Sequence, residues 1–444
     1  MRSQLLFYSI TSALAGFLFG FDTVVISGAE KTIQQLWGLN DQLHGFAMSS
    51  ALWGTVLGSA VGGWPSEKYG RKNTLLWIGL LYFASAVWSG LATDVYSFMI
   101  ARFIGGLGVG ISTVAAPMYI SEIAPAKFRG RLAGMFQFNI VFGILMAFLS
   151  NALLANVGES AWRWMLGVEA IPALIYTIMT IFIPESPRWL LGHAGEVEKA
   201  KRIMLQIDPS RTQSDIDDEA NRILASNEEE SVVAPTFWTR RLSKPILLAF
   251  LIAFFNQLSG INAILYFAPR IFEWTGLAKE SALLQSIGIG VTNLVFTFLG
   301  LYLIDRLGRK TLLIIGSFGY IASLGLCSWA FYTEFYAIVP ACIFAFIAAH
   351  AVGQGAVIWV FISEIFPNQY RASGQALGSF THWIFAALLT TFFPVMVGAM
   401  PPWTIFAFFG FMMTLQLLWV LTMVPETKGV PLEEIQKRLG IADR

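Results

Sequence analysis

Residues Gly62–Lys72 read GGWPSEKYGRK, and residues Gly300–Lys310 read GLYLIDRLGRK. Both segments end in an acidic residue, a basic residue, one variable residue and Gly-Arg-Lys. Two further signatures recur at the same offset of about 240 residues: Ser121-Glu122-Ile123 with Arg129 returns as Ser363-Glu364-Ile365 with Arg371, and Pro184-Glu185 returns as Pro425-Glu426. Three matched pairs at one offset indicate that the second half of the chain repeats the first.

Long apolar stretches make up most of the chain. Of its 444 residues, 56% are hydrophobic and only 13% are charged, whereas ordinary soluble domains carry about a quarter charged residues. This composition excludes a soluble multidomain enzyme. A helix of roughly 20 apolar residues crosses the ~30 Å hydrocarbon core of a bilayer. Twelve such spans are predicted, near Leu5–Ser27, Gly45–Pro65, Asn73–Ala92, Ser97–Ser121, Leu132–Leu154, Trp162–Ile183, Pro245–Phe267, Ala282–Ile304, Thr311–Phe331, Ile338–Ile362, Gly374–Met396 and Trp403–Val424.

The uneven distribution of lysine and arginine sets the predicted orientation. With a cytoplasmic N-terminus, the inner short loops carry Lys68, Arg71, Lys72, Lys127, Arg129, Arg131, Arg306, Arg309, Lys310 and Arg371, and the outer side keeps Lys31, Arg163, Arg270 and Lys279. An even number of spans then places both termini in the cytoplasm. The expected domains are an N-terminal six-helix bundle (1–185), a cytoplasmic helical linker (186–244), a C-terminal six-helix bundle (245–425) and a cytoplasmic tail (426–444).

Several function classes find no support in the sequence. The 29 basic and 28 acidic residues leave a net charge of +1, so no basic excess is available for nucleic acid. The two cysteines, Cys327 and Cys342, lie in apolar stretches and offer no disulfide scaffold or thiolate cluster. Without a nucleophile–base pair, phosphate loop or metal-ligand cluster, we expect neither enzyme activity nor a cofactor or metal. Parallel repeats of six spans are typical of transporters whose halves rock around a central site.

Longer motifs carry a family resemblance over essentially the whole chain. They are the two Gly-Arg-Lys loops, PESPRWLL at Pro184–Leu191, FNQLSGINAILYF at Phe255–Phe267 and PETKG at Pro425–Gly429. With these motifs the chain resembles the sugar porter family of the major facilitator superfamily, and it is similar to bacterial sugar–proton symporters and facilitative glucose transporters. The resemblance implies an all-α integral membrane protein with the major facilitator fold, which has twelve transmembrane helices in two six-helix bundles and a cytoplasmic helical linker.

Three ionisable residues lie inside predicted spans, where an unpaired charge is costly. Asp22 lies near the outer end of the first span, and Arg102 and Glu169 lie near the outer starts of the fourth and sixth spans. At a rise of about 1.5 Å per residue, all three are expected roughly 8–10 Å below the outer boundary. The resemblance implies that Asp22 accepts a proton, that Arg102 is its switching partner and that Glu169 is an auxiliary acid. A static buried ion pair that never titrates is the alternative.

A neutral sugar requires amide and hydroxyl donors and an aromatic face over its ring. Gln257, Asn262 and Tyr266 are spaced by five and four residues, roughly on one broad helix face. Asn262 also follows a Ser-Gly pair at which a helix can open. Each lone amide can instead serve as an interhelical hydrogen-bond partner. The resemblance implies a sugar-binding set of Gln137, Asn256, Gln257, Asn262, Tyr266, Asn293, Trp359, His382 and Trp383.

Two members of this set depart from the family. Asn256 stands where a first Gln is usual, and His382 stands where Gln or Asn is common. Both changes are expected to alter the sugar preference. His382 is also a candidate second proton site, because its unperturbed pKa lies near 6.5. A neutral histidine that donates one hydrogen bond to sugar or backbone is the preferred interpretation.

Matched acidic and basic residues gather at the predicted cytoplasmic ends of the spans. They are Glu67, Arg71, Glu122, Arg129, Glu185, Asp305, Arg309, Glu364, Arg371 and Glu426. We expect them to form salt bridges within and between the halves that close the inner side and break when it opens. The positive-inside rule alone explains the basic residues of this set but not their acidic partners.

The predicted function is the import of a monosaccharide, either a glucose-like hexose or a xylose-like pentose, together with a proton by alternating access. An uncoupled facilitator with the same pocket is the nearest alternative, and a membrane sugar sensor that does not transport is a second. We expect a monomer in the bilayer of a cell (inner) membrane, with no nucleic-acid partner. The sequence leaves the identity of the sugar open.

Overall fold

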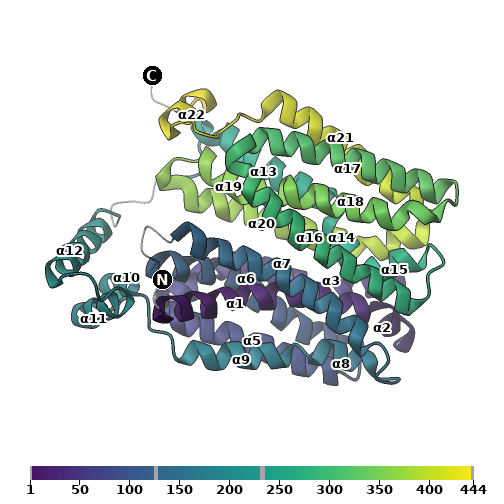
Figure 1. Cartoon of the computed structure of the whole chain (residues 1–444), viewed down its shortest axis with the longest axis horizontal. Helices are drawn as coiled ribbons and strands as arrows, with labels where there is room; N and C mark the ends of the chain where they lie inside the picture. Colours follow the sequence, from purple (N-terminus) through teal and green to yellow (C-terminus); the bar gives the residue numbers. More distant parts are fainter. Residues whose placement is uncertain (1–2, 125–128, 231–235, 442–444) are drawn as a thin grey trace.

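The computed structural model describes residues 3–124, 129–230 and 236–441, and these residues form helices and connecting turns without a β-strand (Figure 1). The long helices of the first half are α1 (Ser3–Val25), α3 (Asp41–Val61), α5 (Arg71–Leu91), α6 (Val95–Ile123), α7 (Arg129–Leu154) and the pair α8 (Ala161–Gly167) and α9 (Ala170–Ile181). Two short helices, α2 (Glu30–Leu36) and α4 (Gly63–Tyr69), connect them. These helices form one layer of the molecule in Figure 1.

The helices of the second half form the other layer in Figure 1. They are α13 (Ser243–Leu258), α14 (Ile261–Tyr266), α15 (Ala268–Glu273), α16 (Lys279–Leu307), α17 (Arg309–Tyr332), α18 (Val339–Val352), α19 (Gln354–Ile365), α20 (Arg371–Ala399) and α21 (Pro402–Met423). In the sequence, the segment that connects the two halves contains α10 (Pro187–Trp189), α11 (Val197–Ile207) and α12 (Gln213–Glu230). Helix α22 (Leu432–Leu439) follows the last span.

Eleven helical segments of the described chain are long and apolar enough to cross a membrane. They coincide with eleven of the twelve spans predicted from the sequence. The remaining one, predicted near Gly45–Pro65, is occupied by α3, which has 21 residues but is rich in glycine and serine. These small residues lower the mean hydropathy of α3. They also allow close packing, since α3 contacts α6 in its own half and α20 in the other.

The internal repeat reappears as two equivalent helix starts. Gly70 and Gly308, with φ of 91° and 92°, directly precede α5 and α17. In the first half Glu185 accepts backbone N–H hydrogen bonds from Arg71 and Lys72 at 2.9 and 3.1 Å. A carboxylate at this position satisfies donors that a helix leaves unpaired at its N-terminus.

The second half repeats this arrangement. Glu426 accepts from the backbone N–H groups of Arg309 and Lys310 at 2.9 and 3.0 Å. A Cβ atom placed on Gly308 would lie 2.5 Å from a carboxylate oxygen of Glu426. The positive φ and the close carboxylate therefore both require glycine before the helix.

Three spans are interrupted. In the seventh span Gly260, with φ of 89°, separates α13 from α14, as the Ser-Gly pair predicted. In the tenth span Gly353 separates α18 from α19, and in the sixth span Glu169 lies between α8 and α9. Each interruption places polar side chains or backbone near the middle of the protein.

The two halves meet along α3 with α20 and along α7 with α16. At the first contact a Cβ atom on Gly45 would lie 1.9 Å from the carbonyl oxygen of Thr391, so the two backbones touch. The Thr391 hydroxyl also lies 2.6 Å from the Ser49 hydroxyl and accepts from the Trp53 indole at 3.2 Å. Helices approach this closely in membranes where small residues line the contact.

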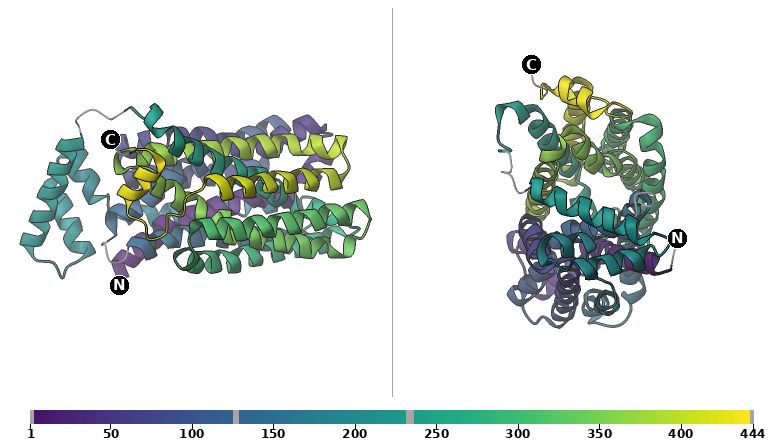
Figure 2. Two further views of the ribbon diagram at one scale, coloured as in Figure 1. Left: turned by 90° about the horizontal axis from the view of Figure 1, so that it is seen from above. Right: turned by 90° about the vertical axis from the view of Figure 1, so that its left-hand side faces the viewer.

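The molecule has two distinct ends. The helices α10–α12, the start of α1 and the final helix α22 lie at one end (Figure 2), which we call the linker-side end. The opposite end, which we call the distal end, carries α2, α15 and the turn between α7 and α8. The start of α1 and the helix α22 therefore lie at the same end, as an even number of spans requires.

The close approach of α6 to α3 yields a stability prediction. A Cβ atom on Gly106 would lie 1.8 Å from the carbonyl oxygen of Ala51. Gly106→Ala should therefore force the helices apart and cost about 1–3 kcal/mol of stability, as overpacking does. A thermal melt of the purified protein in detergent measures the loss.

The matched control is Gly134→Ala in α7, where the new methyl group meets nothing within 4 Å. Its melting temperature should stay the same or rise slightly, since alanine favours helix by up to about 1 kcal/mol. Equal melting temperatures for the two variants would contradict the assigned α3–α6 contact.

Candidate functional site

A buried ion pair joins α1 to α6. The Arg102 guanidinium donates to the Asp22 carboxylate at 2.6 Å and to the Asp22 backbone carbonyl at 2.9 Å. Both residues are 1% exposed. Two hydrogen bonds to one residue fix the guanidinium plane, so the pair locks the rotation of α1 against α6.

Glu169 completes the predicted group of three. It is 1% exposed at the junction of α8 and α9, and it interacts electrostatically with both Asp22 and Arg102. Its Oε1 atom and the Arg102 Nε atom are buried without a hydrogen-bond partner. The structure thus brings the three residues together, as their predicted equal depth required, and leaves one donor and one acceptor unused among them.

The surroundings of the ion pair are small and polar. A Cβ atom on Gly105 would lie 2.4 Å from the Ser85 hydroxyl and 3.5 Å from an Asp22 oxygen. The Ser85 hydroxyl has no hydrogen-bond partner among the described residues, and the fully buried Tyr82 interacts electrostatically with Asp22 and Glu169. A buried hydroxyl beside two acids and a guanidinium can donate or accept a hydrogen bond there.

Tyr266 connects the ion pair to the second half of the protein. It lies at the end of α14, is 2% exposed, and interacts electrostatically with both Arg102 and Asp22. The same short helix carries Asn262, so one turn of α14 presents one residue to the charged group and another to the amide network described next.

A network of amides surrounds the break between α13 and α14. Gln257 donates through Nε2 to Asn256 at 2.9 Å and lies 3.2 Å from a ring nitrogen of His382. Its Oε1 accepts from Asn262 at 2.7 Å. Four of the predicted sugar-binding residues therefore form one hydrogen-bonded network that joins α13, α14 and α20.

Aromatic rings cover this network. The His382 ring lies 4.7 Å from the Trp383 ring and 5.4 Å from the Trp359 ring, measured between centroids. Trp383 also lies 5.4 Å from Phe19 of α1 in the other half. The buried Trp383 indole N–H has no hydrogen-bond partner. An apolar wall with one unused donor is suited to a ring that carries hydroxyl groups.

The last two predicted sugar-binding residues lie on the other helix pair that joins the halves. Asn293 on α16 is 8% exposed and accepts from Thr297 of the same helix at 3.4 Å. Gln137 is half-buried on α7. Among the described residues, no hydrogen bond joins either one to the Gln257 network, so the structure places them near the interface of the halves but not in the network.

An ionic network ties the linker-side end of the first half together. Arg71 pairs with Glu122 and with Glu67, both at 2.9 Å. Glu122 also accepts from the Ser186 hydroxyl, whose backbone N–H donates to Glu185. Burial raises the pKa of Glu185 above its ordinary value, and its backbone hydrogen bonds oppose the rise.

The second half has the same network. Arg309 pairs with Glu364 at 2.7 Å and with Asp305 at 3.1 Å. The Thr427 hydroxyl, in the place of Ser186, donates to Glu364 at 2.6 Å. Arg371 donates to the backbone carbonyl of Ser363 at 2.8 Å. Arg129 begins α7, and its side chain lies outside the described part of the chain.

The sequence predicts ion pairs both within and between the halves. The pairs described above, Arg71 with Glu67 and Glu122 and Arg309 with Asp305 and Glu364, each join residues of the same half.

Charged residues at the distal end join the two halves. Glu30 of α2 is 1% exposed and lies 2.9 Å from the buried His44 ring of α3. Its second oxygen accepts from Arg270 of α15 in the other half at 2.8 Å. Arg270 also donates to Gln34 at 2.6 Å. A second pair, Lys31 with Glu273, links the same two helices.

The distal cluster was not predicted from the sequence. Arg270 and Lys31 were expected only as outer basic residues, and neither Glu30 nor His44 was given a role. The signal was present, since an acid and a histidine stand at the edges of apolar spans. Their partners, however, are about 240 residues away in sequence, and only the closed packing of α2 against α15 brings them together.

Comparisons with known proteins agree with the fold described above. The family model for "Sugar (and other) transporter" matches residues 8–439. The chain is 34% identical to a D-xylose-proton symporter of Escherichia coli (strain K12), over 97% of this chain and 95% of that protein. It is also 34% identical to an arabinose-proton symporter of Bacillus subtilis (strain 168), over 97% and 94%.

A solved structure shows the same architecture. The inward-open conformation of the xylose transporter from E. coli superposes with a TM-score of 0.86 at 32% identity, and the match covers 98% of this chain and 99% of that chain. Sequence and structure agree over nearly the full length of both proteins. The chain is a multi-pass membrane protein and belongs to the sugar porter family of the major facilitator superfamily.

Proposed function

We propose that this protein carries a monosaccharide together with a proton across a cell membrane by alternating access. The observation that carries the proposal is the pair of residues on α14: Tyr266 interacts electrostatically with Asp22 and Arg102, and Asn262 donates a hydrogen bond to Gln257 of the amide network. One short helix, α14, therefore carries both a residue that interacts with the ion pair and a residue of the amide network. The named symporters among the relatives move xylose or arabinose with protons, which supports the same coupling here.

Asp22 is the proposed proton acceptor. While it is ionised, Arg102 is held by its carboxylate and by its backbone carbonyl. Protonation removes the charge that holds the guanidinium, and the acid that remains within reach is Glu169. An unpaired guanidinium is costly at low dielectric, so Arg102 pairs with whichever acid is ionised. Protonation of Asp22 therefore shifts the pairing of Arg102 from Asp22 to Glu169.

The proposed sugar site is the amide network with its aromatic wall. Hydroxyl groups of a pyranose ring would exchange with the hydrogen bonds that Gln257 makes to Asn256 and His382, and an indole would cover the ring face. Both a hexose and a pentose present the required hydroxyl groups. His382 acts in this proposal as a neutral hydrogen-bonding partner.

The moving bodies are the two six-helix halves, residues 1–185 and 245–425, joined by the linker 186–244. The distal end corresponds to the extracellular side and the linker-side end to the cytoplasm. The interhalf ion pairs of the distal cluster and the likeness to an inward-open structure support an inward-facing state. In that state the linker-side networks are intact within each half, so we propose that they brace each half as a rigid body rather than lock the halves together.

The coupling is tested by uptake of labelled glucose and xylose into proteoliposomes, with an inward proton gradient imposed or collapsed. The wild-type protein should accumulate sugar above equilibrium only with the gradient. Asp22→Asn keeps a hydrogen-bond acceptor for Arg102 but cannot titrate, so accumulation should fall to equilibrium while sugar exchange continues.

Glu280→Gln is the matched control, because it neutralises an exposed acid at the start of α16. It should accumulate sugar like the wild type. Equal uptake by the wild type with and without the gradient would instead identify an uncoupled facilitator, with Asp22 and Arg102 as a static pair. Binding of sugar without any exchange would identify the sensor.

The distal cluster yields a separate prediction. Arg270→Gln removes the cation that holds Glu30 to the second half, a charge-assisted hydrogen bond worth about 1.5 kcal/mol. The outward-facing population should rise by about tenfold. The rate at which a membrane-impermeant maleimide labels Ser27→Cys, a position now 3% exposed, measures this population.

Lys279→Gln serves as the comparison, since Lys279 makes only a 3.4 Å contact to Thr32 across the same end. Labelling of Ser27→Cys should change little in that background. If Arg270→Gln and Lys279→Gln accelerate labelling equally, or neither does, the distal cluster is not the closing contact.

A further inference from the structure

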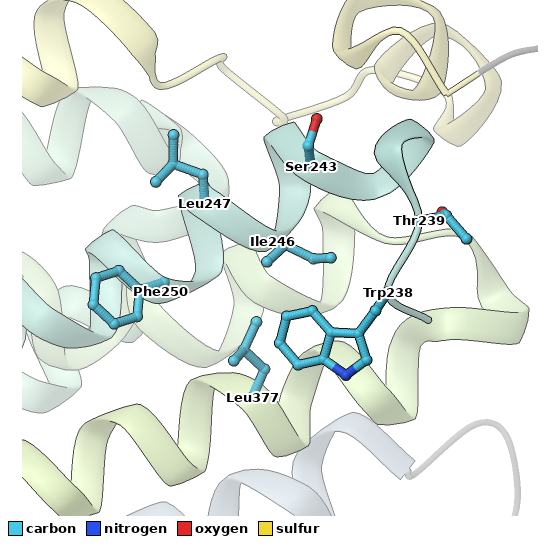
Figure 3. Close-up of a pocket in the computed structure, with 7 residues that line it drawn as sticks. All are labelled: Trp238, Thr239, Ser243, Ile246, Leu247, Phe250 and Leu377. Atoms are coloured by element: carbon cyan, nitrogen blue, oxygen red, sulfur yellow. The ribbon is translucent and has the colours of Figure 1, made fainter. Parts of the chain in front are cut away.

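An apolar groove opens at the linker-side end of the second half, between the start of α13 and α20 (Figure 3). Trp238, Leu247 and Phe250 line it from one side and Leu377 from the other, around a volume of about 450 Å³. Trp238 is 70% exposed and Leu247 is 42% exposed. Large apolar side chains left open on one groove require an apolar occupant.

The mouth of the groove is polar and cationic. Thr239 and Ser243 line it with hydroxyl groups. The residue that follows each of them, Arg240 and Lys244, is exposed. Helix α13 begins at Ser243 without a side-chain cap and without an acidic residue in its first turn. The mouth therefore offers two hydroxyl groups and the positive end of a helix dipole to a negatively charged group, and an exposed cation follows each hydroxyl residue in the sequence.

The depth of the groove matches the edge of a bilayer. The span that contains α13 runs from Arg240 to Tyr266, so the mouth lies at the level of the lipid headgroups. Phe250 is seven residues beyond Ser243, about 10 Å deeper along the helix. A tryptophan at the mouth is typical of the membrane–water interface. The polar mouth thus lies at the depth of a lipid headgroup, and the apolar floor lies at the depth of its acyl chain.

We propose that this groove binds an anionic phospholipid. One acyl chain lies along Trp238, Phe250 and Leu377, and the phosphate lies between the Thr239 and Ser243 hydroxyls beside Arg240 and Lys244. Zwitterionic lipids fill the same floor, but their headgroup adds a cation beside the phosphate, so two basic residues favour a headgroup with a net negative charge. The proposal depends on insertion in a membrane and not on sugar or proton transport.

Arg241 supports the geometry of the mouth. Its guanidinium donates to the backbone carbonyl of Ile441, which follows α22. This contact ties the turn Arg240–Leu242 to the segment that follows α22.

Native mass spectrometry of the full chain in detergent tests the proposal, with phosphatidylglycerol and phosphatidylcholine of identical acyl chains as the two probes. The tightest binding event should favour phosphatidylglycerol. The double variant R240Q/K244Q should weaken phosphatidylglycerol binding by roughly 5- to 30-fold, the factor expected for one or two interfacial cations, and leave phosphatidylcholine binding unchanged.

The matched control is K199Q/R202Q, which removes two exposed cations from α11 on the same side of the membrane. It should leave both affinities unchanged. Leu377→Trp fills the floor and should weaken both lipids alike while the cations remain. Equal affinity of the wild type for the two lipids, or unchanged phosphatidylglycerol binding in R240Q/K244Q, would overturn the proposal. Uptake assays play no part in either outcome, so the result is independent of the transport proposal.

Discussion

The buried pair of Asp22 and Arg102 constrains the whole first half of the protein. Neither partner has access to water, and separating them inside an apolar bundle would cost several kcal/mol. α1 and α6 therefore stay in contact unless a proton or another charge replaces one partner. Glu169 at the α8–α9 junction is the acid that we propose for this exchange, because it interacts electrostatically with both Asp22 and Arg102. The small residue at Gly105 follows from the same constraint, because a larger side chain would meet Ser85 and the carboxylate.

The repeat of the sequence explains why each half can behave as one body. In both halves an arginine follows a glycine with positive φ and forms an ion pair with a glutamate near the end of another span. A second glutamate accepts hydrogen bonds from the backbone N–H groups at the start of the helix that this arginine begins. These contacts depend on residues of one half alone. The contacts between the halves include the close backbone approach of Gly45 to Thr391, side-chain hydrogen bonds to the Thr391 hydroxyl, and ion pairs at the distal end. Rigid halves and a separable interface are what a rocking motion requires.

Much of this arrangement was predictable from sequence, and the limits have physical causes. Apolar stretches of spanning length give the helices. Equal depth allows Asp22, Arg102 and Glu169 to meet if their spans touch, and the family resemblance groups the three residues. The Ser-Gly pair predicted the break that precedes Asn262. The Glu30–Arg270 contact was not predictable, because its partners meet only when one end is closed and topology does not state which end that is. Gln137 and Asn293 show the reverse case, since the family motif places them in the site but the structure places them outside the hydrogen-bonded network.

The helix break at Gly260 allows the proposed sugar site to affect the packing of the helices around it. Gln257 lies before the break and Asn262 after it, and the bond between them spans the gap that the missing helical hydrogen bonds leave. His382 extends the network to α20, which packs on α3 of the other half. A sugar that takes over the hydrogen bonds of Gln257 therefore competes with the bonds that hold α13, α14 and α20 in register. Since Tyr266 ends the same short helix beside Asp22 and Arg102, any shift of α14 also changes the surroundings of the titratable pair. In the proposed mechanism substrate and proton are thus coupled through one six-residue helix, without a direct contact between them.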